Sequence, residues 1–171
     1  MSIQNIEIKA RCENQDAVRK FLKENNAAYK GRDHQIDTYF NVPNGRLKLR
    51  EGTIENNLIH YQREEATRPK SSQVLLYSSK PDSSLRQLLA YAMGILAVVD
   101  KKREIYFIDN VKFHIDNVET LGRFIEIEAI DTDGTIGAEK LRTQCEYYLD
   151  RFGIADDQLV SNSYSDMVIN G

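Results

Sequence analysis

Apolar and polar residues alternate along residues 3–11, IQNIEIKAR, and this alternation constrains the fold more than any other feature of the chain. Side chains in an extended strand point alternately to its two faces. Ile6 and Ile8 would therefore share one face, while the opposite face carries the polar residues Asn5, Glu7, Lys9 and Arg11. The segment is predicted to be a half-buried strand whose charges lie in a row.

Seven further segments have strand-like composition, namely residues 35–40, 45–51, 57–63, 73–79, 97–108, 111–119 and 123–130. Turn formers such as Asn44-Gly45 and Asp109-Asn110 separate several of them. Apolar residues at helical spacing predict helices within 14–26, 136–153 and a short terminal turn at 162–170, with another that starts near Pro81. About eight strands in mostly antiparallel order favour an α+β fold with a large curved or closed sheet, since closure removes exposed edges.

The chain as a whole excludes several classes of protein. Its 171 residues fit one domain spanning 1–171, and a net charge of −3 suggests neither nucleic acid nor an anionic membrane as partner. The apolar stretch at 85–99 is too short and too polar to cross a bilayer. Cys12 and Cys145 lack metal-ligand spacing, and no apolar signal core begins the chain. We therefore expect a cytoplasmic protein with reduced thiols, either a monomer or a homodimer.

Charges of one sign are gathered on particular strands. The basic side chains that share strand faces are Lys9, Arg11, Arg46, Lys48, Arg50, Arg63, Lys101 and Arg103. A surface built only for solubility would mix the two signs, because like charges two residues apart on a strand repel each other. These rows of cations therefore indicate an anionic partner. The planar fork of arginine and the mobile charge of lysine together suit a polyphosphate more than a single carboxylate.

The strand at 123–130 carries carboxylates instead. Glu126 and Glu128 would project to the same side, about 7 Å apart. Two carboxylates at that spacing can gather a hard divalent cation, and Glu7 and Asp116 could complete the site. A cation held there would bridge the carboxylates and phosphate oxygens, which is how catalysis of phosphoryl transfer is usually supplied.

Several stretches share their pattern with a known family: Asn5-Ile6-Glu7-Ile8-Lys9, QIDTYFNVPNGRLKLRE, Tyr61 with Arg63, KKREIY, HIDNVETLGRFIEIE and SYSD. Together, from about Ile3 to Ile169, they resemble the CYTH superfamily, which includes class IV adenylyl cyclases, thiamine triphosphatases and inorganic triphosphatases. The resemblance implies an eight-stranded antiparallel closed β-barrel, the triphosphate tunnel, with flanking helices. It also implies a small-molecule substrate, which is a nucleotide such as ATP or another organic or inorganic triphosphate.

The resemblance further implies a role for individual residues. A set of cations would grip the triphosphate, namely Lys9, Arg46, Lys48, Arg50, Arg63, Lys101 and Arg103. Of these, Lys9 and Arg63 would be catalytic. Mg²⁺ or Mn²⁺ would be held by the acidic set Glu7, Glu126, Glu128 and Asp116. The family signature is Glu-x-Glu-x-Lys, and Asn5 replaces its first glutamate. An amide oxygen can ligate a cation but carries no charge, so affinity for a second metal should fall.

Three hypotheses about function remain open at this point. The first is a metal-dependent enzyme that hydrolyses a triphosphate or cyclises ATP, and the second is a non-catalytic binder of nucleotide or polyphosphate, which Asn5 favours. In the third, the charged strands are simply the water-facing side of an ordinary α+β domain. Among the histidines, His34 is predicted to lie in a loop and His60 out of phase with its charged neighbours, so only His114 could reach the tunnel.

Overall fold

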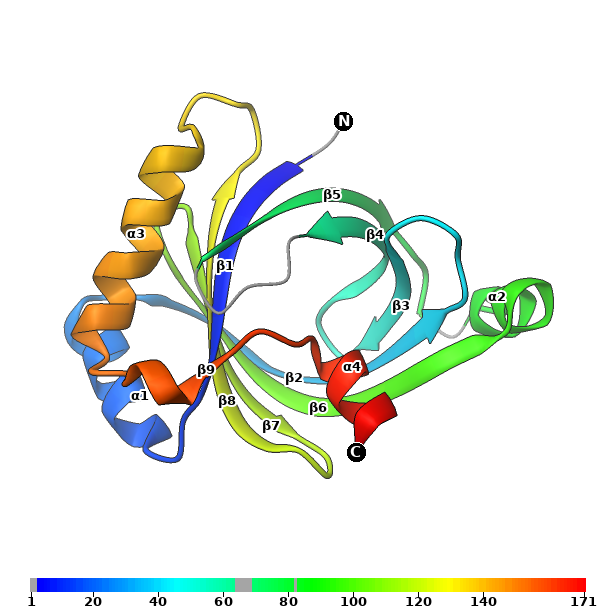
Figure 1. Ribbon diagram of the computed structural model, residues 1–171, viewed down its shortest axis with the longest axis horizontal. Coiled ribbons are helices and arrows are strands. Elements are labelled where there is room, and N and C mark those ends of the chain that lie inside the picture. The colour runs from blue at the N-terminus through cyan, green and yellow to red at the C-terminus, as the bar shows by residue number, and fades with distance from the viewer. Residues whose placement is uncertain (1–2, 64–68, 82) are drawn as a thin grey trace.

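Eight strands form a closed antiparallel barrel in the computed structural model, which describes residues 3–63, 69–81 and 83–171 (Figure 1). The strands are β1 Ile3–Arg11, β2 Ala28–Phe40, β3 Arg46–Gly52, β4 Asn56–Arg63, β5 Lys70–Ser78, β6 Ile95–Ile108, β7 Val111–Val118 and β8 Gly122–Asp131. Their order around the barrel is β1-β5-β4-β3-β2-β6-β7-β8, and β8 pairs with β1 to close it. A short β9, Leu159–Val160, adds to β1. The predicted closed eight-stranded barrel is confirmed.

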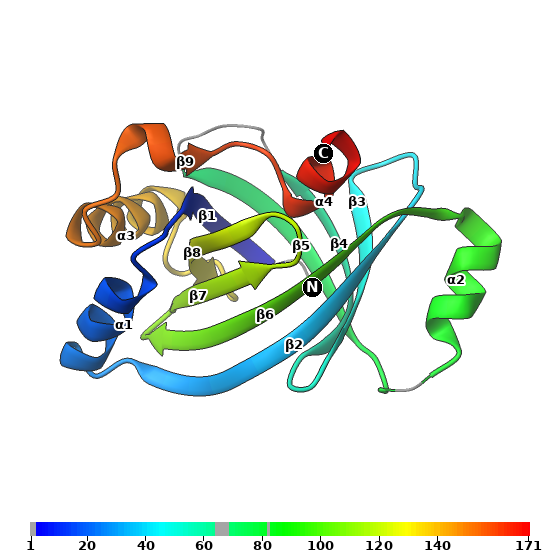
Figure 2. The same cartoon turned by 90° about the horizontal axis from the view of Figure 1, so that it is seen from below.

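Helices flank the barrel on two sides. They are α1 Gln15–Glu24, α2 Leu85–Met93, α3 Ala138–Arg151 and α4 Tyr164–Asn170, with a 3-10 turn at Asp156–Gln158. Figures 1 and 2 show α1 and α3 together on one side of the barrel and α2 on the opposite side. None of the described helices has the length and apolar character needed to span a bilayer.

One helix boundary differs from the prediction. The second helix was expected to start near Pro81, but α2 begins at Leu85. The Ser83 hydroxyl accepts a hydrogen bond from the Leu85 backbone N–H at 3.4 Å, so this serine satisfies a donor at the helix start. The helix thus starts after Ser84, four residues beyond Pro81.

The largest apolar core lies outside the barrel, between its wall and the helices. Ile6 and Ile8 of β1 pack with Phe113 of β7, and α1 contributes Leu22 and α3 contributes Leu141 to the same cluster. Asn14 caps the start of α1, because its side chain accepts from the Ala17 N–H. The apolar faces of β1, β7 and β8 are thus turned outward and covered by helices.

The charged faces of these strands must therefore point into the barrel, because successive side chains alternate across the wall. Lys9, Lys101 and Arg103 are each no more than 5% exposed. This burial excludes the hypothesis that the charged strands form an ordinary water-facing surface. Charges withdrawn from water are tolerated only when they are paired or hydrogen-bonded.

The outer core generates a prediction about stability. Leu22 of α1 is fully buried, so Leu22→Ala should lower the free energy of unfolding by about 3–4 kcal/mol through lost burial and the remaining cavity. Leu88 of α2 is 59% exposed, and Leu88→Ala should change stability by less than about 0.5 kcal/mol. Urea denaturation of both variants checks the difference, and equal losses would contradict the assignment of the core.

Candidate functional site

A cavity of about 190 Å³ runs into the barrel and is lined by side chains from all eight of its strands. The described cationic side chains in its wall are Lys9, Lys48, Arg50, Lys101, Arg103 and Lys112. The described acidic ones are Glu7, Glu55, Glu126 and Glu128. The strand register therefore brings together residues from both ends of the chain in one charged interior.

The glutamates gather where β1 and β8 pair. Glu7 lies directly opposite Glu128 in the register, and Lys9 lies opposite Glu126. Burial raises the pKa of Glu128, and the negative charges of Glu7 and Glu126 raise it further. Burial and the neighbouring carboxylates both disfavour the ionised form of Glu128. A cation bound beside these carboxylates would favour the ionised form, because it neutralises the negative charge.

Asn5, the residue that departs from the family signature, contacts this acidic group directly. Its Nδ2 donates a 2.6 Å hydrogen bond to Oε1 of Glu128. Its Oδ1 is buried and has no hydrogen-bond partner among the described residues. A buried acceptor without a donor is costly, so a cation or a donor group would satisfy it. The amide therefore holds one glutamate in place while leaving an oxygen available.

On the opposite wall a single carboxylate holds three cations. Asp37 of β2 is fully buried and accepts two 2.9 Å hydrogen bonds from Arg50, one to each carboxylate oxygen. Lys101 Nζ lies 2.7 Å from Asp37 Oδ2, and Lys48 Nζ lies 3.3 Å from the same oxygen. Burial alone would raise the pKa of Asp37, but the charges of Arg50 and Lys101 outweigh it and hold the pKa well below its usual range.

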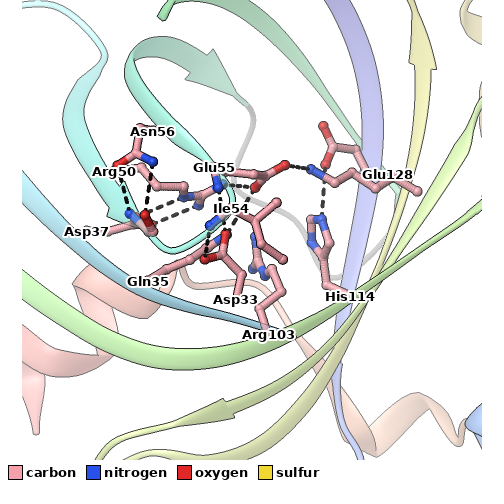
Figure 3. A network of polar contacts seen from close by, with 12 residues as sticks. Asp33, Gln35, Asp37, Arg50, Ile54, Glu55, Asn56, Arg103, His114 and Glu128 are labelled. Atoms are coloured by element: carbon pink, nitrogen blue, oxygen red, sulfur yellow. Dashed lines mark hydrogen bonds and ion pairs between the residues drawn. The ribbon is translucent and has the colours of Figure 1, made fainter. Parts of the chain in front are cut away.

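Glu55 pairs with cations from two strands at the turn between β3 and β4. Its carboxylate lies 3.2 Å from Arg50 Nη1 and 2.5 Å from Lys112 Nζ. Figure 3 shows Arg50 between Asp37 and Glu55, with His114 and Glu128 on the far side of Glu55. Burial opposes ionisation of Glu55, yet the charges of Lys112 and Arg50 hold its pKa far below the usual value.

Asp116, which was predicted as a metal ligand, lies behind the cavity wall instead of in it. It accepts two 2.7 Å hydrogen bonds from Arg103 and a third, also 2.7 Å, from the Tyr164 hydroxyl. It is fully buried. With these contacts the carboxylate fixes the guanidinium plane of Arg103, whose Nη2 also lies 3.1 Å from Glu126.

Two predicted triphosphate ligands are placed differently from the rest. Arg46 does not line the cavity, and its Nη2 lies 2.7 Å from Oδ1 of Asp166 in α4. Arg63 ends β4 with its backbone opposite Ser72, but its side chain lies outside the part of the chain that the structure describes. The other predicted site residues, Asp116 apart, all line the cavity.

The three histidines occupy distinct environments. His114 faces the cavity as predicted, and its ring nitrogens lie 3.8 Å from Glu126 and 3.9 Å from Glu128 without a hydrogen bond among the described residues. Burial, assisted by Arg103, lowers the pKa of His114 to about 4. His60 points outward, to the Asn44 carbonyl. The loop predicted for His34 is wrong, since this residue lies within β2 and contacts Asp100 of β6.

Sequence reasoning missed four residues of this site. Asp37 and Lys112 alternate correctly within predicted strands, so their phase could have revealed them. Glu55 sits in a turn and Tyr164 in the terminal helix, where strand periodicity carries no signal. Tyr164 nevertheless lines the cavity, with its ring centre 3.8 Å from Lys9 Nζ. The terminal SYSD stretch was the available signal for Tyr164.

The oxygen ligands in the acidic wall are of the kind that binds a divalent cation, although their side chains do not converge on one point. Within the described residues, no three His, Cys, Asp or Glu side chains converge at metal-binding distances. The donor set is nevertheless appropriate, because carboxylate and amide oxygens are the ligands of Mg²⁺ and Mn²⁺. Glu7, Glu126 and Glu128 line one wall, and the unpartnered Oδ1 of Asn5 lies beside them.

The three-cation contact of Asp37 generates a prediction. Asp37→Asn leaves Lys101, Arg50 and Lys48 without their shared counter-charge, so unfolding free energy at pH 7 should fall by roughly 3–5 kcal/mol. Because the folded-state pKa is depressed, the contribution of the carboxylate is complete above the unfolded pKa of about 3.9 and is lost as pH falls through the folded pKa.

Urea denaturation should therefore show a difference between wild type and Asp37→Asn that is about 1 kcal/mol smaller at pH 3 than at pH 7. The control is Asp100→Asn, because the Asp100 side chain is 46% exposed and its carboxylate contacts His34 on the outside of the barrel. That variant should lose less than about 1 kcal/mol. A pH-independent loss in Asp37→Asn would contradict the assigned charge.

Solved structures share the fold of this chain. The PH1012 protein from Pyrococcus horikoshii has a TM-score of 0.80 at 23% identity, covering 96% of this chain and 99% of that one. A candidate adenylate cyclase from Vibrio parahaemolyticus has a TM-score of 0.77 at 18% identity, with 98% of each chain covered. A candidate adenylyl cyclase from Hippeastrum with a dominant triphosphatase activity has a TM-score of 0.64 at 13% identity, over 99% and 95%. At such identities the likeness concerns the fold alone.

The sequence matches no curated protein. The family model of the CYTH domain, in contrast, matches residues 4–154, a span that contains most of β1 and all of β2 to β8, α1, α2 and α3. The matched span thus includes both acidic strands and the cations on β3 and β6. The chain therefore belongs to the CYTH domain family.

Proposed function

We propose that the chain is a divalent-metal-dependent enzyme that acts on a triphosphate-bearing small molecule, by hydrolysis or by cyclisation of a nucleotide. The observation that carries this proposal is the division of the cavity wall by sign. Glu7, Glu126 and Glu128 lie on β1 and β8, and four cations, Lys48, Arg50, Lys101 and Arg103, lie on β3 and β6. Lys9 of β1 and Lys112 of β7 are the cavity cations that lie on or beside the acidic strands. An anion with several charges can contact the cations while a cation lies between it and the glutamates.

The family supports the proposal at a coarser level. CYTH proteins include triphosphatases and class IV adenylate cyclases, and the enzymes are generally dependent on divalent metals. For this chain we assign Mg²⁺ or Mn²⁺ to Glu7, Glu126 and Glu128, with the Asn5 amide oxygen beside them. When bound, the ion would neutralise phosphate charge and polarise a phosphoryl oxygen.

The cations would bind the triphosphate by charge and by hydrogen bonding. Arg50 and Arg103 offer planar forks that match phosphate oxygens, and Lys9, Lys48 and Lys101 offer point charges. We propose that Lys9 and Arg63 contact the reacting phosphoryl group. Asp116 acts as a positioning residue, because its two carboxylate oxygens accept hydrogen bonds from Nε and Nη2 of Arg103. Arg46 can reach the ligand only if it leaves Asp166.

Hydrolysis and cyclisation differ in the attacking oxygen, which is that of water or of the ribose 3′-hydroxyl. The same grip on the phosphates serves both reactions. His114 lines the cavity without a hydrogen-bonded partner among the described residues, and its depressed pKa keeps it neutral near pH 7. A neutral imidazole there can accept a proton from either attacking group.

A second candidate function is a non-catalytic binder of triphosphates. The specific observation in its favour is the hydrogen bond from Asn5 to Glu128, which occupies one oxygen of an expected metal ligand with an amide donor. Such a protein would bind the anion through its cations alone and would show no turnover.

Product analysis tests the primary proposal. With Mg²⁺ or Mn²⁺, the wild-type protein should release phosphate or pyrophosphate from inorganic triphosphate, ATP or thiamine triphosphate. Glu7→Gln should lower that activity by roughly 10²-fold, because a carboxylate facing the cation is lost. The control is Glu51→Gln, because Glu51 of β3 does not line the cavity. This variant should keep full activity. Absence of turnover with every triphosphate would overturn the proposal.

Replacement of Asn5 distinguishes the two candidates. Asn5→Glu restores the signature carboxylate beside Glu128, so divalent-metal affinity measured by calorimetry should rise about tenfold or more. If the chain is an enzyme, the wild type already turns over and the variant works at lower metal concentration. Turnover in Asn5→Glu alone, with tight metal-independent binding by the wild type, would instead establish the binder.

A further inference from the structure

The two ends of the cavity differ in exposure. At one end the lining residues are nearly buried, namely Lys9, Tyr39, Tyr61 and Ser163. Tyr164, the first residue of α4, is also buried and lines the cavity there. At the other end β1 begins while β5 and β8 finish, and the lining there is partly open. We call this second end the open end, formed by Ile3, Leu76, Ile130, Asn57 and Glu55.

The wall at the open end is aliphatic along the side where β1, β4 and β5 meet. Ile3 pairs with Val74 in the register, and Leu76 pairs with Ile59. All four line the cavity, as does Ile130 of β8. Leu76 is 49% exposed. A leucine so exposed contributes little to the core, so its apolar surface is available to a ligand.

Three of the cavity cations are thus offset from the apolar surface, while Glu55 brings a carboxylate, paired with Lys112, to the open end. Lys9, Lys101 and Arg103 lie deeper, toward Tyr164, than the aliphatic group does. A ligand that enters by the open end with its phosphates leading would leave its non-phosphate part against Ile3, Leu76 and Ile130. Inorganic triphosphate would leave this surface uncovered and gain nothing from it.

A polar side chain adjoins the aliphatic wall at the open end. Asn57 of β4 lines the cavity beside Ile59, and its amide offers both a donor and an acceptor. Ligand sites are typically apolar with a few placed polar groups that fix orientation. A flat heteroaromatic ring carries an apolar face for the leucine and isoleucines and a polar edge for this amide.

Resting on the proposed function, we propose that the open end is a subsite for the organic part of the substrate. The substrate class is a triphosphate ester of a heteroaromatic compound, such as a nucleoside triphosphate, and not inorganic triphosphate. Leu76 is a specificity-determining residue that contacts the ring, and Asn57 binds its edge.

Calorimetry in EDTA, where metal-dependent turnover cannot occur, tests the subsite. The probes are ATP, ribose 5-triphosphate, which lacks the ring, and inorganic triphosphate. Wild type should bind ATP about tenfold more tightly than the other two. Burial of roughly 55 Å² of apolar surface, at about 25 cal/mol per Å², corresponds to a tenfold ratio of affinities. Leu76→Asn should abolish most of that preference and leave affinity for inorganic triphosphate unchanged.

Leu75→Asn is the matched control. Leu75 neighbours Leu76 on β5 and is 50% exposed, but it does not line the cavity, so this variant should bind like wild type. If Leu76→Asn unfolds, Leu76→Ala gives the same comparison with a smaller fold-change.

Equal affinity of wild type for the three probes would overturn the subsite and leave the proposed function intact. Equal weakening of ATP binding in Leu75→Asn and Leu76→Asn would do the same. Failure of all three probes to bind both in EDTA and with Mg²⁺ would overturn the proposed function itself.

Discussion

Every feature of this molecule depends on where the apolar faces of the strands are buried. In many antiparallel sheets the apolar face forms the core and the polar face meets water. Here α1 and α3 cover the outside of β1, β7 and β8, so the apolar faces point outward and the charged faces point into a closed barrel. Charges placed there cannot rely on water, and each needs a partner.

The partners are carboxylates shared among several cations. Asp37 serves Arg50, Lys101 and Lys48, while Glu55 serves Arg50 and Lys112. For the proposed polyanion, binding would be an exchange in which phosphate oxygens compete with internal carboxylates for the same donors. This arrangement keeps the side chains ordered before the ligand arrives, which lowers the entropy lost on binding.

Much of this arrangement could be predicted from the sequence, because strand periodicity assigns faces reliably. The phase of Glu7 and Lys9, and that of Glu126 and Glu128, placed four side chains in the cavity correctly. The same reasoning could not separate Asp116 from them, because phase gives the face of a strand but not the depth along it. Asp116 lies where Tyr164 and Arg103 enclose it.

The remaining residues depend on contacts between distant segments. Glu55 enters the site from a turn, and Asp166 reaches Arg46 from a helix 120 positions away, so neither contact follows from local pattern. His34 was placed in a loop because the strand predicted at 35–40 begins one residue after it. In the structure a register irregularity at Gly31 lets β2 continue through this segment.

Closure of the barrel by β1 also affects how the chain folds. Asn5 and Glu128 lie 123 positions apart, so the first strand must wait for the eighth before the acidic wall exists. Long-range pairing of this kind slows folding, because the entropy of closing a long loop is lost before the contacts form. The interior charges therefore keep their hydration until late in folding, and the final step that expels water also completes the binding site.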